Sequence, residues 1–352
     1  MKVCILGNGL VSLTLAKALI NEGIYVDIIS NKKKIIYSKE RTLGISSSNI
    51  KFFNENIINI NKLLWDIKKI EILSESLKNQ KILDFENNNH KLFSIIKNHK
   101  LYDLLFLKVK SSKFLDFKKK FKKNKYELII NCDSNSNITK KFFFKKFYKN
   151  YESNAYTSII EHKRIKINNV ATQVFTKNGP LAFLPISKNF TSIVYSYRGA
   201  KKINFKDEIE RYNVGYKIIK FGKINISKLK FLILRSYYHE NILAFGDLLH
   251  KLHPLAGQGF NMSIRDIKEL LRLIKLKKSN GLNLDSSICS SFEENFKHKN
   301  YLFSNGIDFI YETFKFESKI NTNFLSKSLS LMNKNKKLSS IFTKFADNGL
   351  IF

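Results

Sequence analysis

The sequence predicts an α/β fold in which the pieces of one α/β domain flank an inserted, mainly antiparallel β-sheet region. Residues 2–6 and 24–29 are short apolar runs, and residues 10–22 between them carry small and apolar side chains at helical spacing. From Ala155 to Arg198 the pattern changes to short β-branched and aromatic runs separated by turn-forming residues. The first pattern predicts a β-α-β opening, and the second predicts an antiparallel sheet.

The remaining segments are assigned by the same periodicities. Residues 46–70 have a helical pattern, although many Asn and Lys residues obscure its ends. An apolar run at 241–245 predicts a buried strand, which a loop connects to a helix from about 259 to 275. The final fifty residues are basic and carry Phe and Leu at helical spacing, which predicts a helical C-terminal region.

This pattern divides the chain into three parts. An apolar content of 43% over 352 residues is enough for a substantial core. The discontinuous α/β domain consists of residues 1–65, 91–150 and 236–300, the β-rich domain of residues 66–90 and 151–235, and the helical C-terminal region of residues 301–352.

The formal net charge of +33 is the most unusual property of the composition. Only seven of the 62 basic residues are Arg, the side chain best suited to bidentate phosphate recognition, and Lys is accompanied by abundant Asn, Ile and Phe. This combination is typical of the codon bias of an AT-rich genome. We therefore expect a solvated basic surface first and an anionic membrane surface second, since a well-placed basic residue contributes about 1 kcal/mol there. We expect no nucleic-acid partner.

Three further observations bear on the cellular compartment. The opening residues MKVCILG lead directly into an apolar run, so we expect no secretion signal. No uninterrupted apolar run approaches the roughly 18 residues of a membrane-spanning helix. Cys4, Cys132 and Cys289 are too few and too scattered for a disulfide framework or a zinc site. We therefore expect a cytoplasmic protein without a bound metal.

A glycine-rich motif lies between the first predicted strand and the first predicted helix. Gly7 and Gly9 let backbone N–H groups and the positive end of the helix approach a pyrophosphate, as in dinucleotide-binding Rossmann folds. The pattern is imperfect, because Ser12 replaces a third glycine and Ser30 replaces the acidic residue that binds ribose hydroxyls. A serine still forms hydrogen bonds, although weaker ones than a carboxylate does. The alternative is a tight strand-to-helix turn without a ligand.

The segment from Gly246 to Asp266 is more specific. It reads GDLLHKLHPLAGQGFNMSIRD, so that a carboxylate follows a predicted strand and a glycine-rich turn begins a helix. The positive end of that helix would stabilise an anion such as a reduced flavin, which carries negative charge near N1 and the C2 carbonyl. His250 and His253 raise the alternative of a metal pair, but no third ligand accompanies them, and the neighbouring Pro and Gly residues indicate a shaped loop.

This segment resembles the GD-x-x-H-x-x-HP-x-x-GQG-x-N signature of the flavoprotein hydroxylases similar to para-hydroxybenzoate hydroxylase. A second segment, NGPLAFLP at 178–185, resembles the GPLA-x-LP segment of the ubiquinone-biosynthesis hydroxylases, and ATQVFT at 171–176 precedes it at a similar position. The resemblance covers nearly the whole chain and is most specific from Gly246 to Asp266. It implies a Rossmann-like FAD-binding domain, an inserted substrate domain with a mainly antiparallel β-sheet, and a helical C-terminus.

The same resemblance implies a set of cofactor-binding residues. Asp247 would hydrogen-bond the ribityl chain of FAD, and Pro254 to Asn261 would lie along the isoalloxazine ring. Arg41 would lie near the pyrophosphate and the ribityl chain, and Trp65 and Asn98 also fall at expected positions. No catalytic acid or base is assigned. The full set is Gly7, Gly9, Ser12, Ser30, Arg41, Asp133, Gly246, Asp247, Pro254, Gly257, Gln258, Gly259 and Asn261.

One departure concerns the family's central Asp-Gly motif, which is implicated in binding FAD and NAD(P)H. Here it reads CDSNS at 132–136, so the aspartate is kept and the glycine is lost, and Lys140 replaces the usual arginine. If that glycine served a positive φ angle, Ser134 would carry a steric cost. Together with Ser12, Ser30 and Ser263, this change puts the affinity for FAD in question.

By resemblance, the protein is an FAD-dependent monooxygenase that uses NAD(P)H and O₂ to hydroxylate the ring of a polyprenylphenol precursor of ubiquinone. The segment from Leu181 to Leu184 would wall the substrate side. A hydrophobic phenol held in the bilayer would suit a basic enzyme that is peripheral on the inner face of the membrane and works in a quinone-biosynthesis complex. Two alternatives remain: a non-catalytic binding or assembly subunit with this fold, and a flavin oxidoreductase for an unrelated hydrophobic substrate.

Overall fold

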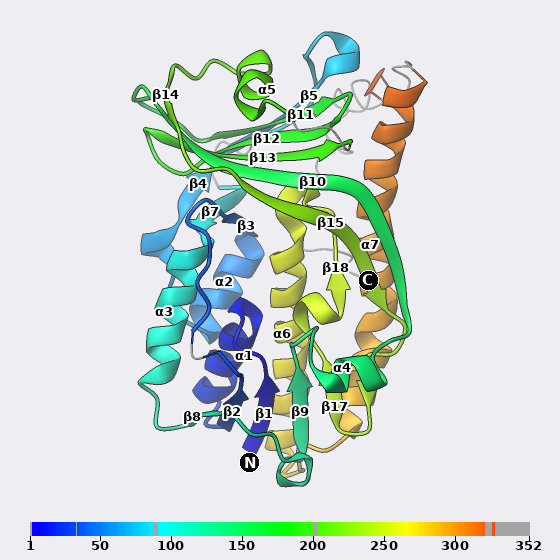
Figure 1. The fold of residues 1–352 in the computed structure, drawn as a ribbon. Helices are drawn as coiled ribbons and strands as arrows, with labels where there is room; N and C mark the ends of the chain where they lie inside the picture. The colour runs from blue at the N-terminus through cyan, green and yellow to red at the C-terminus, as the bar shows by residue number, and fades with distance from the viewer. Residues whose placement is uncertain (1, 33, 87–90, 200–202, 321–325, 328–352) are drawn as a thin grey trace.

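The computed structural model describes residues 2–32, 34–86, 91–199, 203–320 and 326–327. Two large sheets occupy opposite ends of an elongated molecule, and a long helix runs along one side of it (Figure 1). The first sheet has six strands. In spatial order they are β16 (Tyr238–His239), β17 (Ile242–Ala244), β9 (Leu128–Asn131), β1 (Lys2–Leu6), β2 (Tyr25–Ile29) and β8 (Leu115–Lys118).

The first sheet is built on the predicted β-α-β opening. β1 and β2 pair in parallel and are joined by α1 (Leu10–Asn21), and β9 pairs in parallel with the other edge of β1. α1 packs against α3 (Asn98–Lys110) and against α6 (Gln258–Ser279), so that the helices cover the sheet. The apolar runs of both strands and the inner face of α1 are fully buried in one core. The strands predicted at 2–6, 24–29 and 241–245 and the helices predicted at 10–22 and 259–275 are confirmed.

The second sheet has nine strands and is mainly antiparallel, as predicted, with one parallel pair between β11 and β5. One face is covered by α5 (Phe205–Arg211), and the other faces the rest of the molecule (Figure 1). Its strands, in spatial order, are β18 (His250–Lys251), β15 (Asn225–Leu234), β10 (Lys146–His162), β13 (Phe190–Arg198), β12 (Gly179–Pro185), β11 (Val170–Thr176), β5 (Lys69–Ser74) and β6 (Gln80–Glu86), with β14 (Ile218–Phe221) also paired to β10.

A small antiparallel sheet lies between the two large ones and corrects one prediction. Its order is β3 (Thr42–Ser46), β7 (Phe93–Lys97) and β4 (Trp65–Ile67). The single helix predicted at 46–70 is wrong: α2 covers only Ser47–Asn56, a 3₁₀ turn follows at Asn61–Leu63, and β4 and the start of β5 complete the segment. The reason is tertiary, because Trp65 and Ile67 pack into an apolar cluster between the sheets that an isolated helical pattern does not reveal.

The remaining elements frame the second half of the chain. α7 (Ser287–Lys319) is the long helix at the side of the molecule, and α4 (Asn137–Phe142) follows β9. The helix predicted for the final fifty residues is thus confirmed up to Lys319, and residues 321–325 and 328–352 lie outside the described residues. No helix in the described part of the chain combines the length and apolar character needed to cross a bilayer. Because β18 joins the second sheet, elements of the two predicted domains interleave, and the domain boundaries stay a prediction.

Candidate cofactor-binding site

The glycine-rich loop places the positive end of α1 beside the ends of β1 and β9. Gly7 has φ +96°, and a Cβ atom there would lie 3.5 Å from the backbone N and the Cβ of Asp133. This contact brings the first loop against the loop that follows β9. Gly9 is the N-cap of α1 and supplies no side chain, so the first backbone N–H groups of the helix point toward the space above the loop.

The serines that replace family residues fit without strain. Ser12 is buried in α1 next to Cys132, which directly follows β9. Ser30 lies at the end of β2, and its hydroxyl accepts a hydrogen bond from the backbone N–H of Lys32 (3.2 Å). Outside glycine, the described residues have positive φ only at Lys78, Asn79, Glu152 and Glu240, so Ser134 needs no glycine-like backbone. The steric cost considered for Ser134 does not arise.

The predicted charged residues converge on the same loop. Arg41 and Asp247 are both exposed, and both are close enough to Tyr37 to affect the pKa of its phenol. No described residue forms an ion pair with the guanidinium of Arg41. Asp133 instead turns back on its own chain, because its carboxylate accepts a hydrogen bond from the N–H of Asn135 (2.9 Å), just before Ser136, the N-cap of α4. Arg41 and Asp247 therefore remain available to a ligand.

The second loop forms an open cradle beside β3. Gly257 is the N-cap of α6 with φ +63°, and a Cβ atom there would lie 3.7 Å from the backbone N of Gly44. A Cβ atom at Gly259 would meet nothing within 4 Å. The N–H of Gly257 closes the turn by donating to the carbonyl of Pro254 (3.1 Å). A flat ring can approach this surface because no side chain covers the glycine backbone.

Asn261 holds the cradle together through all parts of its side-chain amide. The amide nitrogen donates to the carbonyls of Gly44 (3.0 Å) and Gly257 (3.2 Å). The amide oxygen accepts from the N–H of Ser46 (3.0 Å) and from the side chain of Asn49 (2.9 Å). This predicted cofactor residue therefore fixes β3 and α2 against the start of α6. The side chain of Gln258 similarly accepts a hydrogen bond from Arg265 (2.9 Å).

The two histidines of the motif do not form a metal pair with each other. His250 Nε2 lies 2.5 Å from Asp266 Oδ2, and Asn300 donates to the other carboxylate oxygen (3.0 Å), which ties β18 to α6 and α7. His253 Nδ1 accepts a hydrogen bond from the N–H of Leu255 (3.2 Å). Within the described ranges, no group of three or more His, Cys, Asp or Glu residues is placed to hold a metal ion.

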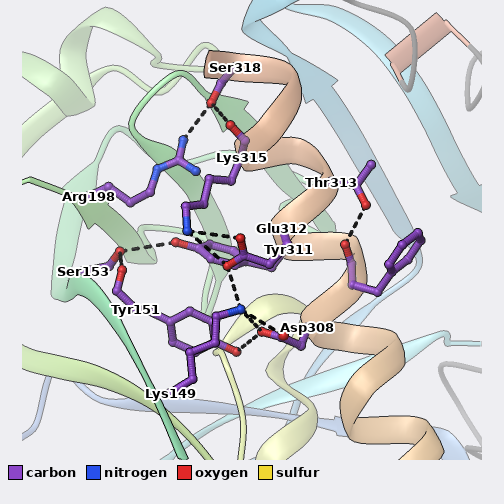
Figure 2. Close-up of polar contacts among 11 residues, drawn as sticks. Lys149, Tyr151, Ser153, Arg198, Asp308, Tyr311, Glu312, Thr313, Lys315 and Ser318 are labelled. Carbon is purple, nitrogen blue, oxygen red and sulfur yellow. Dashed lines mark hydrogen bonds and ion pairs between the residues drawn. The ribbon is translucent and has the colours of Figure 1, made fainter. Parts of the chain in front are cut away.

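His253 is supported by residues that sequence patterns did not single out. Its ring stacks on Tyr311 of α7 (centroids 4.1 Å apart) and meets the edge of Tyr151 of β10 (5.1 Å). Figure 2 shows how both tyrosines are fixed: the Tyr151 hydroxyl donates to Asp308 (2.7 Å), and Tyr311 contacts the Ser153 hydroxyl (3.2 Å). Each of these two hydrogen bonds joins residues more than 150 positions apart, so no local motif could reveal them. The network places the start of the loop before α6 against α7.

The expected substrate wall needs a correction. Leu181 and Phe183 on β12 point away from the cradle and pack into the core under α5. Leu184 points to the opposite face, where it packs near Trp65 and Ile67 of the small sheet. Residues alternate between the two faces of a strand, so the segment from Leu181 to Leu184 cannot wall one side as a unit. Within it, Leu184 faces the cradle side of the sheet.

The residues present fit a bound dinucleotide with a flat ring. The amide groups that begin α1 and the exposed Arg41 suit a pyrophosphate. The side-chain oxygen of Asn98 is buried without a partner among the described residues, and its backbone N–H donates to the Arg41 carbonyl (3.0 Å). That orphaned acceptor suits a ligand hydroxyl, since buried polar atoms are seldom left unpaired. The glycine cradle suits the ring.

Comparison with known proteins identifies relatives of low identity. No protein-family model matches the chain. It is 22% identical to the mitochondrial ubiquinone biosynthesis monooxygenase COQ6 of Schizosaccharomyces pombe over 275 residues. This match covers 64% of this chain and 57% of that protein. It is 26% identical over 156 residues to 3-demethoxyubiquinol 3-hydroxylase of Escherichia coli, which covers 40% of this chain and 39% of that protein.

The chain is similar to monooxygenases and hydroxylases of ubiquinone biosynthesis.

The chain spans about half the length of the curated relatives it matches. Solved structures extend the likeness in fold to nearly the whole molecule. p-Nitrophenol 4-monooxygenase PnpA from Pseudomonas putida superposes with a TM-score of 0.80 at 10% identity, covering 99% of this chain and 98% of that one. CtdE, solved in complex with FAD and a substrate, gives 0.70 at 12% identity, covering 97% and 100%. The predicted fold class is confirmed.

Proposed function

We propose that this relative of the ubiquinone-biosynthesis hydroxylases is an FAD-dependent monooxygenase that hydroxylates the ring of a hydrophobic phenol, with NAD(P)H as the reductant. The observation that supports it most strongly is the glycine cradle at Gly44, Gly257 and Gly259, held in place by the Asn261 amide. When bound there, FAD supplies the oxygen chemistry, which no protein side chain provides. A polyprenylphenol is the substrate class that the relatives' names suggest.

Each part of the chain has a distinct task in this proposal. The N-terminus of α1 and Arg41 bind the pyrophosphate, and the exposed carboxylate of Asp247 accepts hydrogen bonds from the ribityl hydroxyls. The N-terminus of α6 stabilises negative charge on the ring through its dipole. The network behind His253 keeps the loop rigid, so that the ring and the substrate keep a fixed geometry and water is excluded.

The test is the visible absorption spectrum of the purified protein with FAD, before and after anaerobic addition of NADH or NADPH. We expect bound-flavin bands that bleach on reduction and return with oxygen. Arg41→Gln should weaken FAD binding, whereas Arg164→Gln, which changes an exposed arginine beyond the end of β10, should not. A folded protein that takes up no FAD would refute the enzyme and favour the alternative, a non-catalytic subunit of a quinone-biosynthesis complex.

We further propose that the outer face of α7 docks on an anionic membrane surface, from which a hydrophobic phenol would be supplied. This face consists of Tyr301, Leu302, Phe309, Ile310, Phe316 and Ile320, all of them exposed. Asp308 and Glu312 of the same helix point inward to Lys149, and Glu317 is buried against Ser326. The outer face from residue 301 to 320 thus carries apolar side chains and Lys319, while its described Asp and Glu side chains point inward. Such a face is suited to bind a membrane that contains anionic lipid.

Liposome co-sedimentation tests this surface. Phe309→Ser with Phe316→Ser should reduce binding to vesicles that contain an anionic lipid, because these side chains are 71% and 61% exposed. The matched control is Ile167→Ser with Ile219→Ser, which removes side chains of similar exposure (69% and 62%) from the nine-stranded sheet and its loops. Equal binding by all forms, or a concentration-dependent dimer that the α7 changes abolish, would contradict the membrane proposal.

A further inference from the structure

A segment without regular secondary structure crosses the start of α1 between β2 and β3. The side chain of Asn8 donates to the carbonyl of Lys32 (2.6 Å), and the N–H of Ile35 donates to the hydroxyl of Tyr102 on α3 (2.9 Å). Between Ile35 and Arg41, the side chain of Tyr37 points toward α1, where its hydroxyl meets the N–H of Leu10. We call residues 34–41 the strap. The strap lies over the glycine-rich loop at the start of α1, where a pyrophosphate would bind.

The hydroxyl of Tyr37 occupies the end of α1. The N–H of Leu10, in the first turn of the helix, donates to the Tyr37 hydroxyl oxygen (3.1 Å). The same oxygen is the nearest atom to a Cβ placed on Gly9, at 3.6 Å. The phenol hydroxyl therefore reaches the backbone N–H of Leu10 on the side where Gly9 has no side chain. Because Leu10 has one N–H, an oxygen of another group cannot accept this hydrogen bond in the same place while the phenol remains.

The phenol is the weaker of the two acceptors that this position can receive. Burial raises the pKa of Tyr37, so its oxygen is uncharged at neutral pH. A phosphate oxygen is charged, and charge-assisted hydrogen bonds are about twice as strong as neutral ones. The dipole of α1 and the nearby Arg41 further favour an anion over a phenol. A pyrophosphate oxygen would therefore displace the Tyr37 hydroxyl. Without the cofactor, the hydroxyl accepts the hydrogen bond of the Leu10 N–H in its place.

We propose that Tyr37 is a cofactor-exchange latch: FAD binds by replacing the Tyr37 hydroxyl at the Leu10 amide, which releases the strap from α1. This inference rests on the proposed function, since it names how the same site receives its cofactor. The phenol competes with FAD, so removing the hydroxyl should tighten binding. A net hydrogen bond of this kind corresponds to an affinity change of about 2- to 10-fold.

The experiment compares FAD titrations of the full-length wild type, Tyr37→Phe and Tyr102→Phe, followed by quenching of flavin fluorescence. We expect Tyr37→Phe to bind FAD about 2- to 10-fold more tightly. Tyr102→Phe is the matched control, because it removes a phenol that anchors the same strap through Ile35 and leaves the Leu10 amide paired. Hydrogen exchange supplies a second readout: the Leu10 amide should exchange faster in Tyr37→Phe without FAD and regain protection with FAD.

The outcomes separate the latch from the proposed function. Weaker or unchanged FAD binding by Tyr37→Phe, with normal binding by the wild type, would overturn the latch and leave the FAD-binding function intact. Equal tightening by Tyr102→Phe would also overturn it, because the gain would then come from a looser strap rather than from the amide. No FAD binding by either the wild type or Tyr37→Phe would overturn the proposed function together with the latch.

Discussion

A methyl group added at Gly246 would be unfavourable for two reasons. The φ of Gly246 is +65°, which side chains rarely tolerate, and a Cβ atom would lie 3.1 Å from the side chain of Val11 on α1. Gly246→Ala should therefore lower the free energy of unfolding by about 2–5 kcal/mol, the sum of backbone strain and overpacking. Gly23→Ala separates the two causes, because Gly23 has φ +73° with open space around it. Urea unfolding of both variants should show a smaller loss, about 1–2 kcal/mol, for Gly23→Ala, and equal losses would rule out the contact with Val11.

His253 makes stability depend on pH in a defined direction. Burial lowers its pKa to about 3, and the charges of Arg198 and Lys149 add to this effect. The unfolded chain gains a proton as the pH falls through about 6.5, whereas the folded state stays neutral, so stability is lost below that pH by up to about 1.4 kcal/mol per unit. His253→Asn cannot titrate, and its side-chain oxygen can still accept from the N–H of Leu255. The stability advantage of the wild type over this variant should be constant above pH 7.5 and shrink toward pH 5. A constant difference down to pH 5 would contradict a neutral buried histidine.

At the scale of elements, the start of α6 depends on one amide group. Asn261 joins α6 to β3 and α2 through four hydrogen bonds in a buried position. Asn261→Asp should destabilise the protein by about 2–4 kcal/mol, because a carboxylate would face the carbonyls of Gly44 and Gly257 that now accept its N–H groups. Chemical unfolding measures the loss, and hydrogen exchange at β3 should rise with it. Asn283→Asp, at an exposed position in the loop between α6 and α7, should change stability by less than about 0.5 kcal/mol.

The elements that could be predicted from the sequence are those whose signal is local. The run of apolar residues and glycines from Lys2 to Ile29 specifies a β-α-β unit by itself, and Gly257 to Asn261 marks the start of α6. The segment from Ser46 to Ile70 has a helical pattern, but its second half forms strands because neighbouring sheets bury Ile67. Tyr37 and Tyr311 carry no sequence signal at all, since each acts through partners distant in the chain. Local periodicity thus identified the loops of the candidate site, and tertiary packing decided which side chains support them.

At the scale of the whole molecule, the small sheet and helices α6 and α7 are joined to the nine-stranded sheet by more than their loops. Thr42 of β3 and Ser192 of β13 share a hydrogen bond (2.9 Å), and Leu255 and Met262 at the start of α6 pack with Phe175 of β11 in one apolar cluster. α7 adds a long contact, since Lys149 and Tyr151 of β10 both bind Asp308 (Figure 2). The cradle residues themselves belong to the predicted α/β domain, but their neighbours Thr42, Leu255 and Met262 pack against the β-rich domain.

This interlocking predicts that the described elements unfold in one transition. Trp65 is the single tryptophan, and it lies in the small sheet between the large ones, where its indole N–H donates to the carbonyl of Asn168 (2.7 Å). Its fluorescence therefore reports the contact between the sheets, whereas far-ultraviolet circular dichroism reports the secondary structure of both. The two signals should give coincident urea transitions, and FAD at 100 times its Kd should shift both by about 2.7 kcal/mol, because it binds only the assembled site. Two separated transitions, with FAD moving only one of them, would mean that the parallel-sheet half binds the cofactor without the β-rich half.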